Sequence, residues 1–285
     1  MNWITSGLLS IALAFSSLTV GSATPTRATI ALPDSATATP STIASSSTAA
    51  AAAISIDLAT GREIYGKNTE KVLPMASLTK LMTTLIILKG HALTDVVTID
   101  PSVEKLAADS QKLGFVAGDK LTLRQALDAL LVYSANDMAV SLAAWDAGSE
   151  AAFVLKMNQM AETLGLKETH FANASGLDAV NHVSSARDLA KLSQIVLESS
   201  VVREVVQQKS ASVTTQLGKT YKFATTNQLL ANSAVKGLKT GYTLAAGQCL
   251  IAYAVRDGRA ILTVVLGSPD RFAESGQLVN SSLAL

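Results

Sequence analysis

The sequence has a single cysteine and three histidines, and this scarcity restricts the chemistry that the chain can perform. Cys249 cannot form an internal disulfide, and within the run QCLIAYAV we expect it to be a small buried side chain of a strand. His91, His170 and His182 show neither HExxH nor another metal-ligand spacing, so we expect neither a zinc peptidase nor any other metal or cofactor. His182 and Arg187 are interpreted as anchors of a loop.

Charge is also scarce, because the formal net charge is +1. No basic stripe with interleaved aromatic residues occurs, so nucleic acid is not expected as a partner. Apolar residues, in contrast, make up 48% of the 285 positions, which is enough for a substantial core in one large domain or two small ones.

The apolar run near the N-terminus, GLLSIALAFSSLTV at residues 7–20, is too short for a comfortable membrane span. It is followed by the small residues Gly21-Ser22-Ala23, of the kind that a signal peptidase accepts. We therefore predict a signal peptide over residues 1–23, although Met1-Asn2-Trp3 lacks the usual positive charge.

Residues 24–49 consist mainly of Ala, Thr, Ser and Pro, with few large apolar side chains to bury, and are predicted to form a flexible linker. The folded domain is expected to cover residues 50–285. If the signal peptide stayed uncleaved, the linker would tether this domain to a membrane.

Hydrophobic periodicity and turn residues predict strands at both ends of this domain and helices in the middle. The dipeptide Asp257-Gly258 is a strong hairpin signal between two apolar runs. Thr122 and Gln125 form a capping box. We predict an α/β (α+β) fold, with one antiparallel sheet built from both ends of the domain and a helical insertion. Strands are expected at 50–57, 63–66, 96–99, 235–243, 247–255 and 260–267, and helices at 77–90, 122–133, 137–146, 150–164 and 185–199.

The stretch PMASLTKLMT places Ser77 and Lys80 three residues apart, at the start of a predicted helix. Side chains at this spacing lie on one face of a helix and can meet. Ser77 could nevertheless be an ordinary helix cap, since serine is favoured there. Ser102 and Lys105 have the same spacing in PSVEKLAADS without any further sign of chemistry, so spacing alone does not decide between the two interpretations.

Two further stretches decide it: Ser134-Ala135-Asn136 lies between two predicted helices, and Lys239-Thr240-Gly241 lies on a predicted strand. S-x-x-K, S-x-N and K-T-G, in this order, are the motifs of penicillin-binding proteins and class A β-lactamases. With PMASLTKLMT, YSANDMAV, THFANASGL, NHVSSARDLAKL and GLKTGYT, nearly all of residues 50–285 resembles the low-molecular-mass penicillin-binding proteins, the serine D-alanyl-D-alanine carboxypeptidases and related endopeptidases of bacterial cell-wall metabolism. The resemblance implies an antiparallel sheet flanked by helices, with an all-helical subdomain.

The resemblance also implies a role for each motif residue. Ser77 would be the nucleophile and Lys80 its base, which requires a neutral amine; burial and a second cation, Lys239, would lower the pKa of Lys80. Ser134 would relay a proton to the leaving group, and Asn136 would hold the substrate's peptide amide. Lys239 and Thr240 would contact the terminal carboxylate of the substrate, and Gly241 would let the substrate approach the strand closely. The backbone N–H groups of Ser77 and Tyr242 would bind the oxyanion.

The implied activity is removal of the terminal D-alanine from peptidoglycan stem peptides that end in D-Ala-D-Ala, through an acyl-enzyme and without a metal. β-Lactam antibiotics would be acylating inhibitors, and the protein would be exported to the periplasm or the outer face of the bacterial envelope. Many family carboxypeptidases have an additional β-domain and an amphipathic tail that this sequence does not show, so we expect no such anchor, and a DD-endopeptidase remains an alternative.

Two other functions are less favoured by the sequence. A β-lactamase would need a glutamate that activates water, and no E-x-x-L-N stretch occurs between Asn136 and Lys239. A catalytically silent peptidoglycan binder would not need all of the motif residues.

Overall fold

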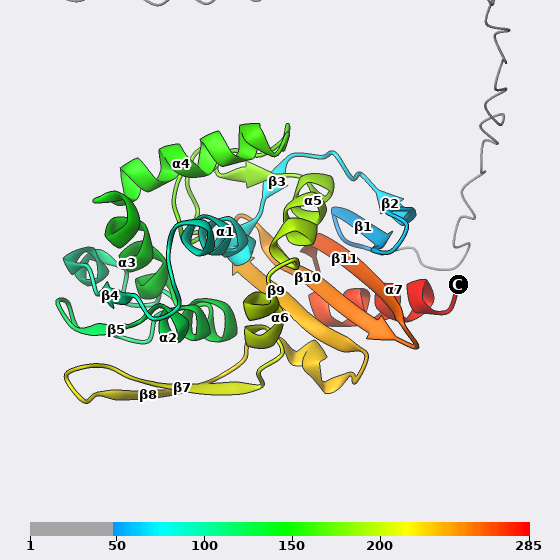
Figure 1. Ribbon diagram of the computed structural model, residues 1–285. Helices are drawn as coiled ribbons and strands as arrows, with labels where there is room; N and C mark the ends of the chain where they lie inside the picture. The colour runs from blue at the N-terminus through cyan, green and yellow to red at the C-terminus, as the bar shows by residue number, and fades with distance from the viewer. Residues whose placement is uncertain (1–47) are drawn as a thin grey trace, which may run out of the picture. The chain divides into compact units, whose positions relative to one another are not determined.

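The computed structural model describes residues 48–285 (Figure 1). The predicted signal peptide (1–23) and most of the predicted linker (24–47) lie outside the described residues, so both stay predictions.

A five-stranded antiparallel sheet, in the order β2-β1-β11-β10-β9, forms the centre of the fold. It joins both ends of the described chain, as predicted. The hairpin between β10 and β11 is also confirmed, because Arg256 pairs with Arg259 across Asp257-Gly258, which both have positive φ. The strands are β1 (Ala52–Asp57), β2 (Glu63–Lys67), β9 (Val235–Thr243), β10 (Gly247–Arg256) and β11 (Arg259–Ser268).

Helices cover both faces of this sheet (Figure 1). The C-terminal helix α7 (Arg271–Leu283) packs on β11, β10 and β1, and Asp270 caps it by accepting hydrogen bonds from the N–H groups of Phe272 and Ala273. Helix α7 was not predicted from the sequence. The other face is covered by α5 (Ala186–Val196), which also contacts α1 (Lys80–Gly90).

The middle of the chain forms the predicted helical subdomain. The capping box of Thr122 and Gln125 is confirmed. The helix expected over 122–133 is in fact α-helical only to Asp128 and then continues as a π-helix to Tyr133. The elements are α2 (Leu123–Asp128), the π-helix η3 (Ala129–Tyr133), α3 (Asn136–Ala147), α4 (Glu150–Thr163) and, beyond them, α6 (Ser200–Val205).

Smaller elements connect these parts. The two-stranded ribbon of β7 and β8 was not predicted, nor were the very short strands β3 and β6, which pair across more than a hundred residues. The small elements are β3 (Leu73–Pro74), β4 (Val96–Thr98), β5 (Lys120–Thr122), β6 (Val183–Ser184), β7 (Ser210–Thr214), β8 (Thr220–Ala224) and the 3₁₀ turns η1 (Ala76–Thr79), η2 (Pro101–Lys105) and η4 (Gln228–Ala231).

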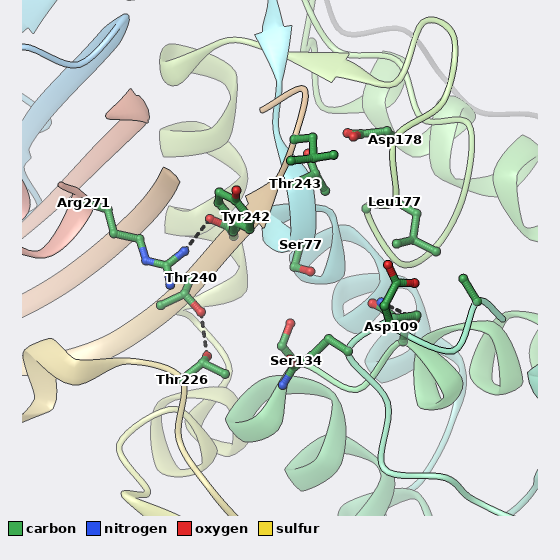
Figure 2. Close-up of a pocket in the computed structure, with 17 residues that line it drawn as sticks. Ser77, Asp109, Ser134, Leu177, Asp178, Thr226, Thr240, Tyr242, Thr243 and Arg271 are labelled. Atoms are coloured by element: carbon green, nitrogen blue, oxygen red, sulfur yellow. Dashed lines mark hydrogen bonds between the residues drawn. The ribbon is translucent and has the colours of Figure 1, made fainter. Parts of the chain in front are cut away.

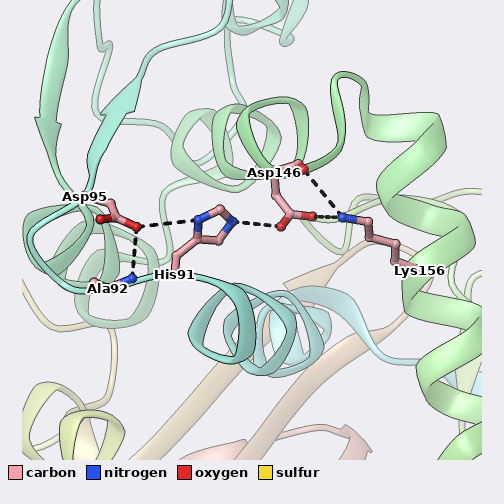
Figure 3. Close-up of polar contacts among 5 residues, drawn as sticks. All are labelled: His91, Ala92, Asp95, Asp146 and Lys156. Atoms are coloured by element: carbon pink, nitrogen blue, oxygen red, sulfur yellow. Dashed lines mark hydrogen bonds and ion pairs between the residues drawn. The ribbon is translucent and has the colours of Figure 1, made fainter. Parts of the chain in front are cut away.

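A polar cluster ties the ends of α1 and α3 to α4 (Figure 3). His91 Nε2 lies 2.9 Å from Asp146 Oδ1, and Lys156 Nζ lies 2.8 Å from Asp146 Oδ2. The imidazole also packs against Trp145, with ring centroids 4.0 Å apart and the ring planes tilted by 38°. These contacts give His91 a structural role.

In the described part of the chain, no single helix has the length and apolar character needed to cross a membrane. The pair α3 and α4, bent by 85° at its junction, meets the requirement only when both helices are taken together.

Candidate active site

A cavity of about 630 Å³ lies between the edge strand β9 and the helical subdomain (Figure 2). All three motifs contribute to its wall. Its lining residues are Ser77, Ala107, Asp109, Ser110, Gln111, Ser134, Asn136, Gly176, Leu177, Asp178, Thr226, Thr240, Gly241, Tyr242, Thr243, Leu244 and Arg271.

Ser77 is a half-buried residue of the turn η1, which runs directly into α1. Its side chain caps no helix, because neither η1 nor α1 has a side-chain cap, so the interpretation of Ser77 as a helix cap is wrong. Lys80 begins α1 and is completely buried. Its Nζ lies 2.9 Å from Ser77 Oγ, so the two side chains meet as the spacing predicts.

Lys80 Nζ has two further partners, Asn136 Oδ1 at 2.7 Å and Ser175 O at 2.5 Å. Both are carbonyl oxygens, which can only accept hydrogen bonds. A neutral amine has two hydrogens and one lone pair, so it can satisfy both carbonyls and turn its lone pair toward the hydroxyl of Ser77. This arrangement suits a base.

The surroundings of Lys80 favour this neutral form. Burial, and secondarily the charge of Lys239, hold the pKa of Lys80 well below its ordinary value, while Asp137 acts in the opposite direction. The predicted direction and both predicted causes are confirmed.

The loop after α4 supplies one of these acceptors, which the sequence analysis missed. Asn173 Oδ1 accepts hydrogen bonds from the backbone N–H groups of Ser175 and Gly176, and Asn173 Nδ2 donates to Leu177 O. The resulting turn presents Ser175 O to Lys80. The family-like stretch THFANASGL marked this loop, but a main-chain acceptor has no signature of its own in a sequence.

The second motif follows the π-helix. Ser134 has a left-handed conformation, with φ of 69°, and Figure 2 shows its hydroxyl pointing toward Ser77. Asn136 is buried, and besides the bond to Lys80 it donates from Nδ2 to Ser110 Oγ at 3.0 Å. One lone pair of its Oδ1 and one hydrogen of its Nδ2 are thus used within the protein, and the second of each is left for contact with a substrate amide.

Asp137 holds the wall opposite β9. Its buried carboxylate accepts hydrogen bonds from the backbone N–H groups of Leu113, Gly114 and Phe115, and from that of Met138 in its own helix. These bonds fix the segment that carries Asp109, Ser110 and Gln111 against the cavity, a function that the sequence did not reveal.

The third motif lies on β9, and its residues differ in exposure to the cavity. Thr240 lines the cavity, and its hydroxyl lies 2.6 Å from that of Thr226, a residue that the sequence analysis missed. Lys239 does not line it; its ammonium is buried behind the wall and donates to Thr240 O at 2.9 Å. Burial and the nearby charge of Arg271 lower the pKa of Lys239 to about 7.

Gly241 lines the cavity and also lies close to the turn that carries Ser77. A β-carbon at this position would lie 3.1–3.2 Å from Ala76 Cβ, Met75 O and Ser77 N, so it would press on the turn that carries Ser77. Arg271, which was also missed, donates to Gly241 O at 2.8 Å and lines the cavity. Tyr242, 58% exposed, lies at the rim.

Residues that were expected to be bystanders have structural contacts. Cys249 is fully buried on β10, as predicted, and burial raises the pKa of its thiol to about 11. Arg187 bonds Thr69 and pairs with Glu63, as a loop anchor should. Lys105, which repeats the spacing of Lys80 in the pair Ser102 and Lys105, is exposed and lies outside the lining of the cavity.

Comparison with known proteins agrees with this geometry. A family model described as D-alanyl-D-alanine carboxypeptidase matches residues 36–270. The chain is 32% identical over 223 residues to the D-alanyl-D-alanine carboxypeptidase DacF of Bacillus subtilis, covering 77% of this chain and 57% of DacF. It is also 32% identical over 260 residues to the D-alanyl-D-alanine endopeptidase of Escherichia coli, covering 85% of this chain and 80% of the relative.

The crystal structure of the Streptomyces K15 DD-transpeptidase superposes with a TM-score of 0.78 at 30% identity, covering 84% of this chain and 98% of that one. With several curated carboxypeptidases, the chain spans only 57 to 62% of the relative's length. The family match covers most of the sequence, and the mixed fold with its antiparallel sheet is shared with a solved relative. The chain belongs to the D-alanyl-D-alanine carboxypeptidase family.

Proposed function

We propose that the protein is a serine-type D-Ala-D-Ala carboxypeptidase, which removes the terminal D-alanine from peptidoglycan stem peptides. One observation carries the proposal: a fully buried lysine amine lies 2.9 Å from a serine hydroxyl in an open cavity, and its other two partners are carbonyl oxygens. An unactivated serine is a weak nucleophile at neutral pH, and an adjacent neutral amine is a base that can activate it.

The proposed cycle begins when Ser77 Oγ attacks the carbonyl carbon of the penultimate D-alanine and its proton passes to Lys80 Nζ. The tetrahedral intermediate is stabilised by the backbone N–H groups of Ser77 and Tyr242. The C–N bond then breaks, and the leaving D-alanine amine receives, through Ser134, the proton that Lys80 had accepted, so that Lys80 is neutral again. Water attacks the ester carbonyl and gives a proton to Lys80. The ester C–O bond then breaks, Lys80 returns this proton to Ser77 Oγ, and the shortened peptide is released as a carboxylic acid.

Thr240 and Arg271 are proposed to bind the substrate's terminal carboxylate, since both line the cavity and one is a cation. Lys239 contributes its charge from behind the wall. β-Lactams, which also carry a carboxylate, are proposed to acylate Ser77. Among the described residues that line the cavity there is no glutamate to activate water, which supports a long-lived adduct over a β-lactamase.

A DD-endopeptidase that cuts peptide cross-links is the second candidate, because the sequence is equally identical, at 32%, to DacF and to the endopeptidase. The catalytic cycle is the same for both. In either case, we propose an exported protein acting at the bacterial cell wall. The cavity and its paired serine and lysine argue against a silent binder.

Incubation with a free pentapeptide and with a cross-linked dimeric muropeptide tests the assignment. We expect faster release of D-alanine from the pentapeptide than cleavage of the dimer, measured by chromatography of both reactions at equal enzyme concentration. Consumption of the dimer alone would assign the protein as an endopeptidase. If neither is consumed and penicillin does not label the protein, the proposal of an enzyme is wrong.

The charge of Lys239 makes substrate binding sensitive to pH. Because the pKa of Lys239 is about 7, this lysine loses its charge as the pH rises through neutrality. We expect KM for a peptide with a free terminal carboxylate to rise roughly three- to tenfold between pH 6 and 8.

The matched control for this prediction is the same peptide with a C-terminal amide, which has no charge for Lys239 to attract. Deprotonation of Lys80 affects both peptides equally, so the ratio of their KM values isolates the effect of Lys239. A ratio that stays constant over this pH range would show that Lys239 does not contribute to carboxylate binding.

A further inference from the structure

His182 is a buried histidine beneath the turn of Ser77, and the proposed cycle does not use it. Only 3% of it is exposed. Its Nδ1 lies 2.9 Å from the backbone nitrogen of Ala172, and its Nε2 lies 2.7 Å from Thr79 Oγ1. Because a backbone N–H can only donate, Nδ1 is the acceptor, and a neutral ring then carries its hydrogen on Nε2. His182 therefore donates to Thr79.

Thr79 passes this hydrogen bond on to the residue before the nucleophile. A hydroxyl has one hydrogen, and that of Thr79 is donated to Ala76 O at 2.8 Å. The bonds thus form one directed chain, from His182 Nε2–H to Thr79 Oγ1–H to Ala76 O.

The carbonyl at the end of this chain belongs to the same peptide group as the N–H of Ser77. In a trans peptide the C=O and the N–H point in opposite directions within one plane, so a bond that fixes the carbonyl also fixes the direction of the N–H. A carbonyl that accepts a hydrogen bond is polarised, which strengthens the N–H of the same group as a donor.

Ala76 is in a conformation that needs such support. Its φ of 49° lies in the left-handed region, which is strained for a residue with a β-carbon. On another side of the same peptide, Gly176 packs so closely that a β-carbon there would lie 2.1 Å from Ala76 O. The bond from Thr79 to Ala76 O opposes any rotation of this peptide.

His182 is also connected to Lys80, the proposed base, through a loop. Its bond from Ala172 N holds the loop whose Ser175 O accepts a hydrogen bond from Lys80. The imidazole thus connects the peptide of the nucleophile to the loop that orients the amine. The charged and titratable groups that act on the ring are His170, Asp178 and Lys80. Burial, which is the largest cause, lowers the pKa of His182 to about 4, with smaller contributions from His170 and Lys80, while Asp178 acts in the opposite direction.

We propose that His182 and Thr79 are positioning residues, which hold the Ala76–Ser77 peptide so that the N–H of Ser77 is oriented and polarised as an oxyanion donor. The inference rests on the proposed function, since it assigns a donor to the tetrahedral intermediate. It predicts that the pair affects the rate of acylation more than the binding of the reactant.

The test compares four single variants of the pair, the double variant of Thr79→Val with His182→Phe, and one control variant with the wild type. Thr79→Val removes the hydroxyl at nearly constant volume, whereas Thr79→Ser keeps it. His182→Phe removes both ring nitrogens, whereas His182→Gln keeps one acceptor and one donor. Thr263→Val is the matched control, because Thr263 is a fully buried threonine of β11 whose hydroxyl has no hydrogen-bond partner in the described structure.

The measured quantities are the limiting rate constant of acylation by a fluorescent penicillin, the dissociation constant of the complex before acylation, and the melting temperature. We expect Thr79→Val and His182→Phe each to lower the rate constant about 10- to 100-fold, with the dissociation constant changed less than threefold. The double variant should be no slower than the slower single variant, because both act through one chain. Thr79→Ser, His182→Gln and Thr263→Val should stay within about fivefold of the wild type.

The pH dependence of the melting temperature is a second readout. Because the pKa of His182 is lowered from 6.5 to about 4, the wild type should keep its full stability above pH 6.5 and lose stability as the pH falls toward 4. His182→Gln should lose less stability over the same interval. An identical loss in the variant would show that the ring nitrogen is not held as an acceptor.

A folded Thr79→Val variant that acylates at the wild-type rate would overturn the proposal, as would a loss confined to the melting temperature. If Thr79→Val does not fold, His182→Gln and His182→Phe give the same comparison. Labelling of Ser77 by a sulfonyl fluoride, which needs no peptide recognition, separates this proposal from the proposed function. If neither the penicillin nor the sulfonyl fluoride labels the wild type, both the proposed function and this proposal are wrong. If the sulfonyl fluoride alone labels the wild type, and labels Thr79→Val more slowly, only the proposed function is wrong.

Discussion

Replacement of Ser77 by alanine is expected to abolish covalent labelling of the protein by a fluorescent penicillin. Opening of the β-lactam ring by acyl transfer requires a nucleophilic oxygen, which alanine does not have. The fold should persist, because Ser77 is only half buried and Lys80 keeps both of its carbonyl acceptors, Asn136 Oδ1 and Ser175 O. Gel fluorescence and the mass of the intact protein before and after incubation measure the result.

The matched control is Ser102→Ala. Ser102 and Lys105 repeat the spacing of Ser77 and Lys80, but they belong to the turn η2, outside the lining of the cavity. Labelling of Ser102→Ala should equal that of the wild type. Residual labelling of Ser77→Ala at a defined site would identify a different nucleophile and remove the basis of the proposed cycle.

The sequence predicted the elements that depend on local patterns. Alternating or continuous apolar runs identified the strands of the main sheet, and Asp257-Gly258 fixed the turn between β10 and β11. The capping box at Thr122 was equally readable, because its residues lie within one helical turn. Side chains within a few residues of each other determine these features, although α7, whose cap Asp270 is equally local, was not predicted.

Elements that depend on distant partners were missed. The strands β3 and β6 have two residues each and exist only because Leu73 pairs with Ser184 and Pro74 with Val183. The ribbon of β7 and β8 is largely exposed, so it lacks the apolar runs by which the other strands were recognised. No local signal in either case was strong enough to indicate the pairing.

The candidate site shows the same division. Side chains in recognisable motifs, such as Ser134 and Thr240, were found in advance and do line one cavity. Ser175 was missed because it acts through a main-chain oxygen. Arg271 was missed because it belongs to none of the three motifs. It reaches the cavity only because α7, which it begins, packs on the sheet.

Replacement of Lys80 by methionine is expected to lower the rate of acylation at least about 10³-fold, because a general base typically contributes 10²- to 10⁴-fold and Ser77 has no other amine in hydrogen-bond contact in the described structure. Methionine retains the length of the side chain without the amine. The second-order rate constant for labelling by penicillin measures the effect, and Lys105→Met, at the exposed lysine of the pair Ser102 and Lys105, is the matched control.

Stability should respond far less than rate to this change. Methionine leaves Asn136 Oδ1 and Ser175 O without their donor, which costs about 1–3 kcal/mol for each buried group. It also removes a fully buried amine whose pKa is held below its ordinary value by burial, which is a gain because the fold disfavours the charged form. Since these terms oppose each other, a folded but unreactive protein is expected. Acylation of Lys80→Met within tenfold of the wild type would show that the proton of Ser77 is accepted elsewhere.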